Sequence, residues 1–169
     1  MKERNPTKMN KEWHDFFITT GGAAAALAGL LFVGVSLNLQ KILSMKRLPE
    51  RALISLVLLM NILIVSILML VPWDSPAPLG FELLFTGLIL YFFVFRLDLR
   101  NYKHTGREFK NRYLLNLFLD QLASIPYMIC GAVILISGEA GIFWIVPAIF
   151  FSFIKSVLDA WVLLVEINR

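Results

Sequence analysis

The sequence predicts an all-α fold: a polytopic transmembrane bundle of about five spanning helices. The 169-residue chain is 58% hydrophobic and only 17% charged, whereas soluble domains are about 45–50% apolar and about 25% charged. Its apolar residues gather in long runs that polar segments separate. A soluble protein of this size could not hide so much apolar surface, so lipid is the expected surrounding. The whole chain, residues 1–169, is expected to form one transmembrane domain.

The predicted helices cover residues 16–39, 52–71, 79–95, 113–136 and 142–167. A spanning helix needs about 20 mostly apolar residues, and the third run, at 17 residues, leaves open whether it spans completely. Helices are expected because a bilayer offers no partner to an unpaired backbone group. The first run is too long for a signal peptide and is expected to be retained. Pro126 and Pro147 are expected to kink or break the last two helices, because proline removes a backbone donor.

Lysine and arginine counts in the connections predict the orientation. The connections after the second and fourth helices hold none, while the other two hold Lys41, Lys46, Arg47 and Arg51, and Arg96, Arg100, Lys103, Arg107, Lys110 and Arg112. The positive-inside rule places these two basic connections in the cytoplasm, with the N-terminus outside and the C-terminus cytoplasmic. The basic residues of the N-terminal tail argue against this orientation. Segment 96–112 is also expected to contact anionic lipid headgroups.

The sequence indicates no catalytic, cofactor-binding or metal-binding site. Cys130 is the single cysteine, and neither His14 nor His104 has a partner at ligand spacing. The net charge of +4 is explained by topology, and no nucleic-acid-binding module accompanies it. We therefore expect no enzyme, no cofactor and no nucleic-acid partner.

Charged residues inside the predicted spans form the candidate functional site. Lys155 and Asp159 are four residues apart and share one helix face, and Asp120 can meet them if the last two helices pack antiparallel. Their estimated depth lies in the cytoplasmic half of the membrane. A polar or small stripe accompanies Asp120 on its own helix and comprises Asn116, Asp120, Ser124, Tyr127 and Gly131.

Three interpretations of these charges remain open. A charge inside a bilayer costs several kcal/mol and usually marks a pathway or a paired site. The cluster is then an ion or proton site, or a structural lock formed by Asp120, Lys155 and Asp159. In the third interpretation, Lys155 and Asp159 extend along the helix to the membrane interface.

The first predicted helix carries small residues at a regular spacing. Gly21, Ala25 and Gly29 recur every four residues, as do Gly22 and Ala26. Small side chains let two backbones approach closely, and in lipid such packing drives helix association. The seam either packs against a neighbouring helix of the same chain or joins copies of the chain in a homo-oligomer.

The stretch WHDFFITTGGAAAALAGLLFVGVSLNLQKIL, followed by LPERA, VPW and GFELL, resembles a family of small uncharacterised bacterial multi-pass membrane proteins. The resemblance implies the bacterial cytoplasmic membrane and supplies no functional residues. We expect a non-enzymatic role, either an oligomeric pore or an ion or small-solute pathway lined by the stripe. The alternative is an adaptor or regulator of a larger membrane complex that transports nothing.

Overall fold

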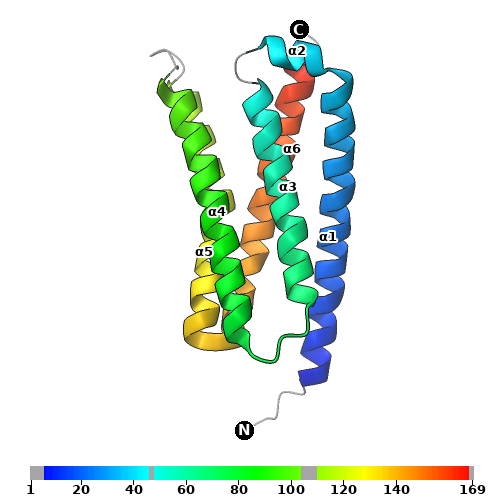
Figure 1. Cartoon of the computed structure of the whole chain (residues 1–169), viewed down its shortest axis with the longest axis vertical. Helices are drawn as coiled ribbons and strands as arrows, with labels where there is room; N and C mark the ends of the chain where they lie inside the picture. Colours follow the sequence, from blue (N-terminus) through cyan, green and yellow to red (C-terminus); the bar gives the residue numbers. More distant parts are fainter. Residues whose placement is uncertain (1–5, 46–47, 104–109, 168–169) are drawn as a thin grey trace.

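The computed structural model describes residues 6–45, 48–103 and 110–167, and every regular element within them is helical. The elements are α1 (Pro6–Leu37), α2 (Leu39–Ser44), α3 (Leu48–Leu70), α4 (Pro76–Lys103), α5 (Lys110–Ser137), the 3-10 helix η2 (Gly138–Trp144) and α6 (Ile145–Ile167). The five long helices run alternately up and down one axis, so α1 begins at one end of the bundle and α6 finishes at the other (Figure 1). The second of these ends is called the α2 end, because α2 lies across it.

Five segments of these helices are long and apolar enough to cross a bilayer. They are Trp13–Leu37, Leu48–Leu70, Pro76–Arg100, Leu114–Ser137 and Ala140–Glu166. The shortest has 23 residues and rises about 35 Å, which exceeds the roughly 30 Å of a hydrocarbon core. The predicted all-helical architecture is thus confirmed in the described residues, and its length and composition suggest a membrane protein.

The third predicted helix is longer than the sequence indicated. The sequence predicts this helix over residues 79–95, but α4 begins at Pro76 and ends at Lys103. Proline is tolerated in a first turn, where the missing N–H has no helical partner to lose. At the other end Leu97 and Asp98 continue the inward face, while Arg96 and Arg100 stay exposed. Charged residues therefore ended the apolar run without ending the helix.

The first helix begins earlier than predicted, at Pro6 instead of residue 16, and the remaining bounds shift by a few residues. The first helix stops at Leu37 rather than at residue 39, and Asn38 donates a side-chain hydrogen bond of 3.0 Å to the carbonyl of Gly34. The second helix begins at residue 48 instead of 52, and the fourth covers 110–137 instead of 113–136. The last helix begins at residue 145 instead of 142, because η2 occupies the preceding residues.

The two prolines do not break these helices. α5 continues through Pro126, and Pro147 lies in the first turn of α6, where no helical hydrogen bond is lost. The reversal between the two helices comes instead at Gly138, whose φ of 64° is a left-handed conformation that glycine adopts without strain. The compact η2 then leads directly into α6, which holds α5 and α6 antiparallel.

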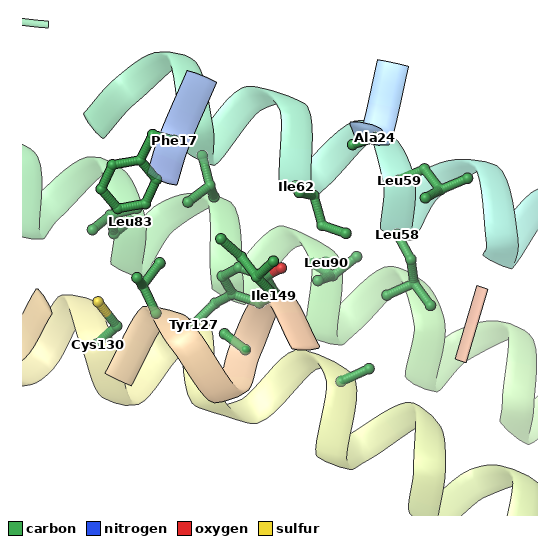
Figure 2. Packing of buried hydrophobic residues seen from close by; sticks show 14 of the residues in the cluster. Phe17, Ala24, Leu58, Leu59, Ile62, Leu83, Leu90, Tyr127, Cys130 and Ile149 are labelled. Atoms are coloured by element: carbon green, nitrogen blue, oxygen red, sulfur yellow. The ribbon is translucent and has the colours of Figure 1, made fainter. Parts of the chain in front are cut away.

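The centre of the bundle is formed by α3, α5 and α6, while α1 packs chiefly on α3 and α4 chiefly on α5. Lipid tails are as apolar as leucine, so helices in a membrane associate through close packing and hydrogen bonds. Gly131 of α5 illustrates the closeness, since a Cβ there would lie 2.5 Å from the backbone nitrogen of Leu84. The fully buried side chains between the helices include Phe17, Leu58, Ile62, Leu83 and Tyr127 (Figure 2).

Candidate functional site

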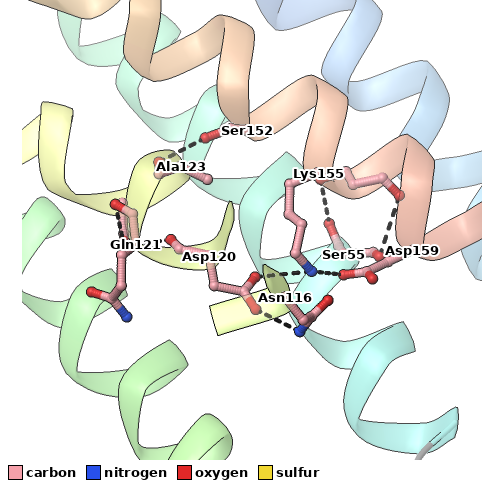
Figure 3. Close-up of polar contacts among 10 residues, drawn as sticks. Ser55, Asn116, Asp120, Gln121, Ala123, Ser152, Lys155 and Asp159 are labelled. Atoms are coloured by element: carbon pink, nitrogen blue, oxygen red, sulfur yellow. Dashed lines mark hydrogen bonds and ion pairs between the residues drawn. The ribbon is translucent and has the colours of Figure 1, made fainter. Parts of the chain in front are cut away.

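A charged triad lies inside the bundle and consists of Asp120 on α5 with Lys155 and Asp159 on α6 (Figure 3). The Lys155 Nζ is 2.9 Å from Oδ1 of Asp120. The same ammonium donates a hydrogen bond to Oδ2 of Asp159. The three residues are only 0%, 1% and 3% exposed in chain order. One ammonium therefore bridges two carboxylates in the interior.

Helix geometry and one amide hold the triad in place. Lys155 and Asp159 are one turn apart on α6, and the antiparallel α5 brings Asp120 opposite them. Nδ2 of Asn116, one turn earlier on α5, donates a hydrogen bond of 2.9 Å to Oδ2 of Asp120. Both oxygens of Asp120 thus have a donor or cation beside them. Counted alone, the triad carries a formal charge of −1, and Arg51 of α3 lies within electrostatic reach of Asp120.

Hydroxyl groups continue the polar contacts between α5 and α6, away from the α2 end. The Tyr127 hydroxyl donates to Ser152 Oγ over 3.1 Å, and Ser152 donates in turn to the carbonyl of Ala123 over 3.0 Å. Asn61 of α3 lies beside the same tyrosine hydroxyl. All of these side chains are buried, so polar groups follow the α5–α6 interface beyond the triad.

A reciprocal pair of serines joins α3 to α6 near the triad. The Ser55 hydroxyl donates to the Ser156 carbonyl over 3.4 Å, and the Ser156 hydroxyl donates to the Ser55 carbonyl over 3.3 Å. Both serines are buried. In a hydrocarbon surrounding such contacts contribute about 0.6 kcal/mol each on average. They fix the position of α6, and hence of Lys155, against α3.

The predicted stripe on α5 faces the interior of its own bundle. Asp120, Ser124, Tyr127 and Gly131 are buried, and Asn116 is half-buried. The Ser124 hydroxyl donates to the carbonyl of Asp120 on its own helix over 2.8 Å. Gly131 instead lets α4 approach α5. The residues of the stripe therefore make different contacts: Asp120 and Tyr127 contact α6, Ser124 bonds to its own helix, and Gly131 packs against α4. They do not form one continuous lining.

The structure rules out one interpretation of the triad. Lys155 and Asp159 do not extend to the bundle surface, because both are 3% exposed or less and their charged groups contact each other. The interpretation as snorkelling side chains is therefore wrong. The structural lock and the ion or proton site both fit the observed contacts.

Asp98 is a member of the site that the sequence interpretation missed. It is 1% exposed on α4 and lies within electrostatic reach of Asp120, Lys155 and Asp159. The sequence interpretation placed it in a basic connection, whereas α4 continues through it. A usable signal existed, because Asp98 follows the buried Leu90 and Val94 at helical spacing.

The small residues of α1 divide between two surfaces. Gly21 is buried, and a Cβ at this position would lie 3.0 Å from Cβ of Ser66 on α3. The Thr20 and Ser66 hydroxyls are also within hydrogen-bond distance, 3.2 Å apart. The other four residues face outward from the chain, and they are Gly22, Ala25, Ala26 and Gly29. Gly21 thus serves packing within the chain, and the remaining four form an open face.

Other candidate groups are occupied or lie outside the described part. Cys130 is buried, and its Sγ donates to the Gly141 carbonyl over 3.3 Å. Arg100 forms an ion pair with Glu50 of α3. No group of three or more His, Cys, Asp or Glu side chains suited to a metal ion occurs among the described residues. From the basic connections, Lys46, Arg47, His104 and Arg107 lie outside the described ranges.

Comparison of the chain with protein-family models, with curated proteins and with solved structures finds no match. The class that the fold defines is thus a helical bundle with five candidate membrane spans. The resemblance to a family of small bacterial membrane proteins stays a prediction.

Proposed function

We propose that this chain is a multi-pass protein of the bacterial cytoplasmic membrane that carries protons, or another small cation, through the interior of its own bundle. The observation that supports this role best is Lys155, an ammonium 1% exposed that bridges Asp120 and Asp159. It is the eleventh of the 23 residues of α6 and so lies near the middle of that helix. Charged side chains at such depth are expensive and typically mark ion pathways or proton relays.

The charge balance of the triad favours a cationic cargo. Two carboxylates and one ammonium leave a formal charge of −1 where an anion would be repelled and a cation would be stabilised. A proton fits best, because it can be passed between hydrogen-bonded side chains and needs no open lumen. A larger solute would need a lumen beside the triad, and the triad residues are almost completely enclosed.

The proposed route follows the α5–α6 interface. On one side of the triad lie Ser152 and Tyr127, whose hydroxyls are hydrogen-bonded to each other. On the other side lies Asp98, close to the α2 end. The positive-inside rule places the α2 end, with its basic connections, in the cytoplasm. The triad would then lie in the cytoplasmic half of the membrane.

A ring of subunits is not required for this route. The triad and the Tyr127–Ser152 contact lie inside the single bundle, so a pathway along the α5–α6 interface would run through each chain. A homo-oligomer remains part of the proposal, joined by the outward face of Gly22, Ala25, Ala26 and Gly29.

The alternative is a membrane adaptor that transports nothing. The observation that favours it is the same outward face of α1, where nothing lies within 4 Å of a Cβ built on Gly22 or Gly29. Such a face can accept a helix of another membrane protein. In this reading the triad only locks α5 to α6.

The deciding experiment is proton flux into liposomes that contain the purified protein, driven by a potassium diffusion potential and read with an enclosed pH dye. The proposal expects flux in the wild type and its loss in Asp120→Asn. The matched control is Glu82→Gln, which removes one carboxylate on α4 outside the triad and should conduct normally. Each variant must first show the wild-type elution volume and helix content.

The flux assay distinguishes the proton pathway from the adaptor. Absence of flux in the folded wild type would reject the pathway and leave the adaptor, whose crosslinked partner should then be a distinct membrane protein. Flux that survives in Asp120→Asn would show that protons cross by a route that does not use the triad.

Accessibility of introduced cysteines tests the same route independently. In a Cys130→Ala background, Asn116→Cys should react with a water-soluble thiol reagent if water reaches the stripe. Leu115→Cys and Phe118→Cys are the controls, because both positions are 61% exposed on the outer side of α5 and would face lipid. Equal inertness of all three positions would contradict a water-connected route.

A further inference from the structure

The helix α4 lies at the edge of the bundle (Figure 1), and a shallow apolar groove runs along it. It is lined by Phe85, Leu88, Ile89, Phe92, Phe93 and Arg96. A second hollow continues it toward the α2 end and is lined by Phe93, Arg96, Leu97 and Arg100. The two hollows share Phe93 and Arg96, so they form one track that is apolar along its length and basic at one end.

The charges at the end of this track are available to an anion. Arg96 is exposed and has no carboxylate within ion-pair distance among the described residues. Arg100 pairs with Glu50, yet its side chain is still 63% exposed. The two residues are four apart, so both guanidinium groups lie on one side of α4. Guanidinium groups bind phosphate oxygens with two parallel hydrogen bonds.

The length of the track matches one leaflet of a bilayer. Eleven positions separate Phe85 from Arg96, which is about 16 Å along a helix. Half of a hydrocarbon core is about 15 Å thick. The candidate span of this helix ends at Arg100, so the arginines lie where the headgroups begin.

We propose that this track binds one anionic phospholipid, with the phosphate at Arg96 and Arg100 and an acyl chain along Phe85, Ile89 and Phe92. The apolar lining suits an acyl chain, and the two arginines suit a negatively charged headgroup. The distance between the apolar lining and the arginines suits a lipid molecule that lies in a single leaflet. Cytoplasmic leaflets are rich in anionic lipid, which agrees with the predicted orientation. This inference does not depend on the proposed proton pathway.

A lipid bound in the groove would also affect the ion pair that joins α4 to α3. The Arg100 side chain links α4 to Glu50 at the start of α3, and α4 otherwise packs mostly on α5. A phosphate between the arginines would compete with Glu50 for Arg100. The bound lipid and the α3–α4 ion pair are therefore linked, and Glu50→Gln should strengthen lipid retention.

The test is native mass spectrometry of the full chain in detergent, with added dioleoyl phosphatidylglycerol or dioleoyl phosphatidylcholine. The expected result is a one-lipid adduct that prefers the glycerol headgroup. Arg96→Gln should weaken this adduct about fivefold, the effect expected for one basic residue at a membrane surface. Lys41→Gln is the matched control, because Lys41 is an exposed cation on α2 at the same end of the bundle.

The acyl part is tested by filling the groove. Ile89→Trp adds bulk at a lining position that is 53% exposed, so the variant should fold normally and retain less dioleoyl lipid. An equal loss in Lys41→Gln and Arg96→Gln would overturn the site, since general surface charge would then explain binding. Displacement of the lipid by equimolar inorganic phosphate would also overturn it, because the arginines would then form an anion site without the groove.

Discussion

The Lys155 ammonium lies 2.9 Å from the Asp120 carboxylate although neither side chain is more than 2% exposed. The two residues come from facing helices and are held by the antiparallel turn at Gly138. Taking two charges out of water carries a desolvation cost of several kcal/mol per ion, which only close and well-satisfied contacts offset. The stability of the α5–α6 pair therefore depends on this contact being complete.

Removal of the ammonium alone should be strongly destabilising. Lys155→Met leaves two buried carboxylates without their shared cation, and losing one partner of a buried pair costs about 3–5 kcal/mol. The measurement is the unfolding midpoint in mixed micelles with increasing dodecyl sulfate. The double variant Lys155→Met with Asp120→Asn should recover part of the loss. A double variant less stable than the single one would contradict the ion-pair explanation.

Neighbouring glycines of α1 should respond differently to the same substitution. Gly21→Val places a branched side chain against Ser66, where even a Cβ would lie 3.0 Å from its neighbour, and overpacking costs about 1–3 kcal/mol. Gly22→Val meets nothing within 4 Å, so the folding stability of a single chain should change by no more than about 0.5 kcal/mol. Thermal unfolding in detergent checks both. A similar loss in both variants would mean that Gly22 is covered in the folded protein.

Size-exclusion mass analysis of Gly22→Val adds a second readout. If the outward face of α1 joins copies of the chain, the variant should run as a smaller assembly than the wild type. An unchanged assembly would remove this face as the homo-oligomer seam while leaving the Gly21 result intact.

A methyl group at position 131 should disrupt the packing of α4 against α5. A Cβ there would lie 2.5 Å from the backbone nitrogen of Leu84, and backbone cannot move aside as a side-chain end can. Gly131→Ala is expected to separate the helices and to cost about 1–3 kcal/mol. Gly34→Ala, with nothing within 4 Å, is the control. The unfolding midpoint distinguishes them, and equal midpoints would refute the close approach.

The single thiol should report on opening of the α5–η2 turn. Cys130 is completely buried and donates to the carbonyl of Gly141. A membrane-permeant maleimide should therefore modify the native protein far more slowly than the denatured protein. The ratio is measured by intact mass over time. Comparable rates would show that the turn opens frequently.

How far the sequence predicts this molecule depends on the kind of signal. Apolar runs located all five long helices, because lipid exposure forces the pattern. The spacing of Lys155 and Asp159 predicted a shared face, and the short turn indicated that α5 would meet α6. Asp98 was missed, because the apolar run ends before Arg96 although α4 continues to Lys103. The split of Gly21 from Gly22 could not be predicted either, since it depends on which side of α1 meets α3.

The wide separation of the triad in sequence has a consequence for how the chain is made. Asp120 precedes Lys155 by 35 positions, and ribosomes add about 5–20 residues per second, so the cation follows its partner by about 2–7 seconds. During that interval the candidate span Leu114–Ser137 of α5 holds the Asp120 carboxylate and no lysine or arginine. Insertion of this span alone would place an unpaired carboxylate in the bilayer, which costs free energy. Insertion of α5 and α6 together as one hairpin would avoid this cost. The Gly138 turn, which is synthesised between the two candidate spans, would let them enter a membrane as a unit.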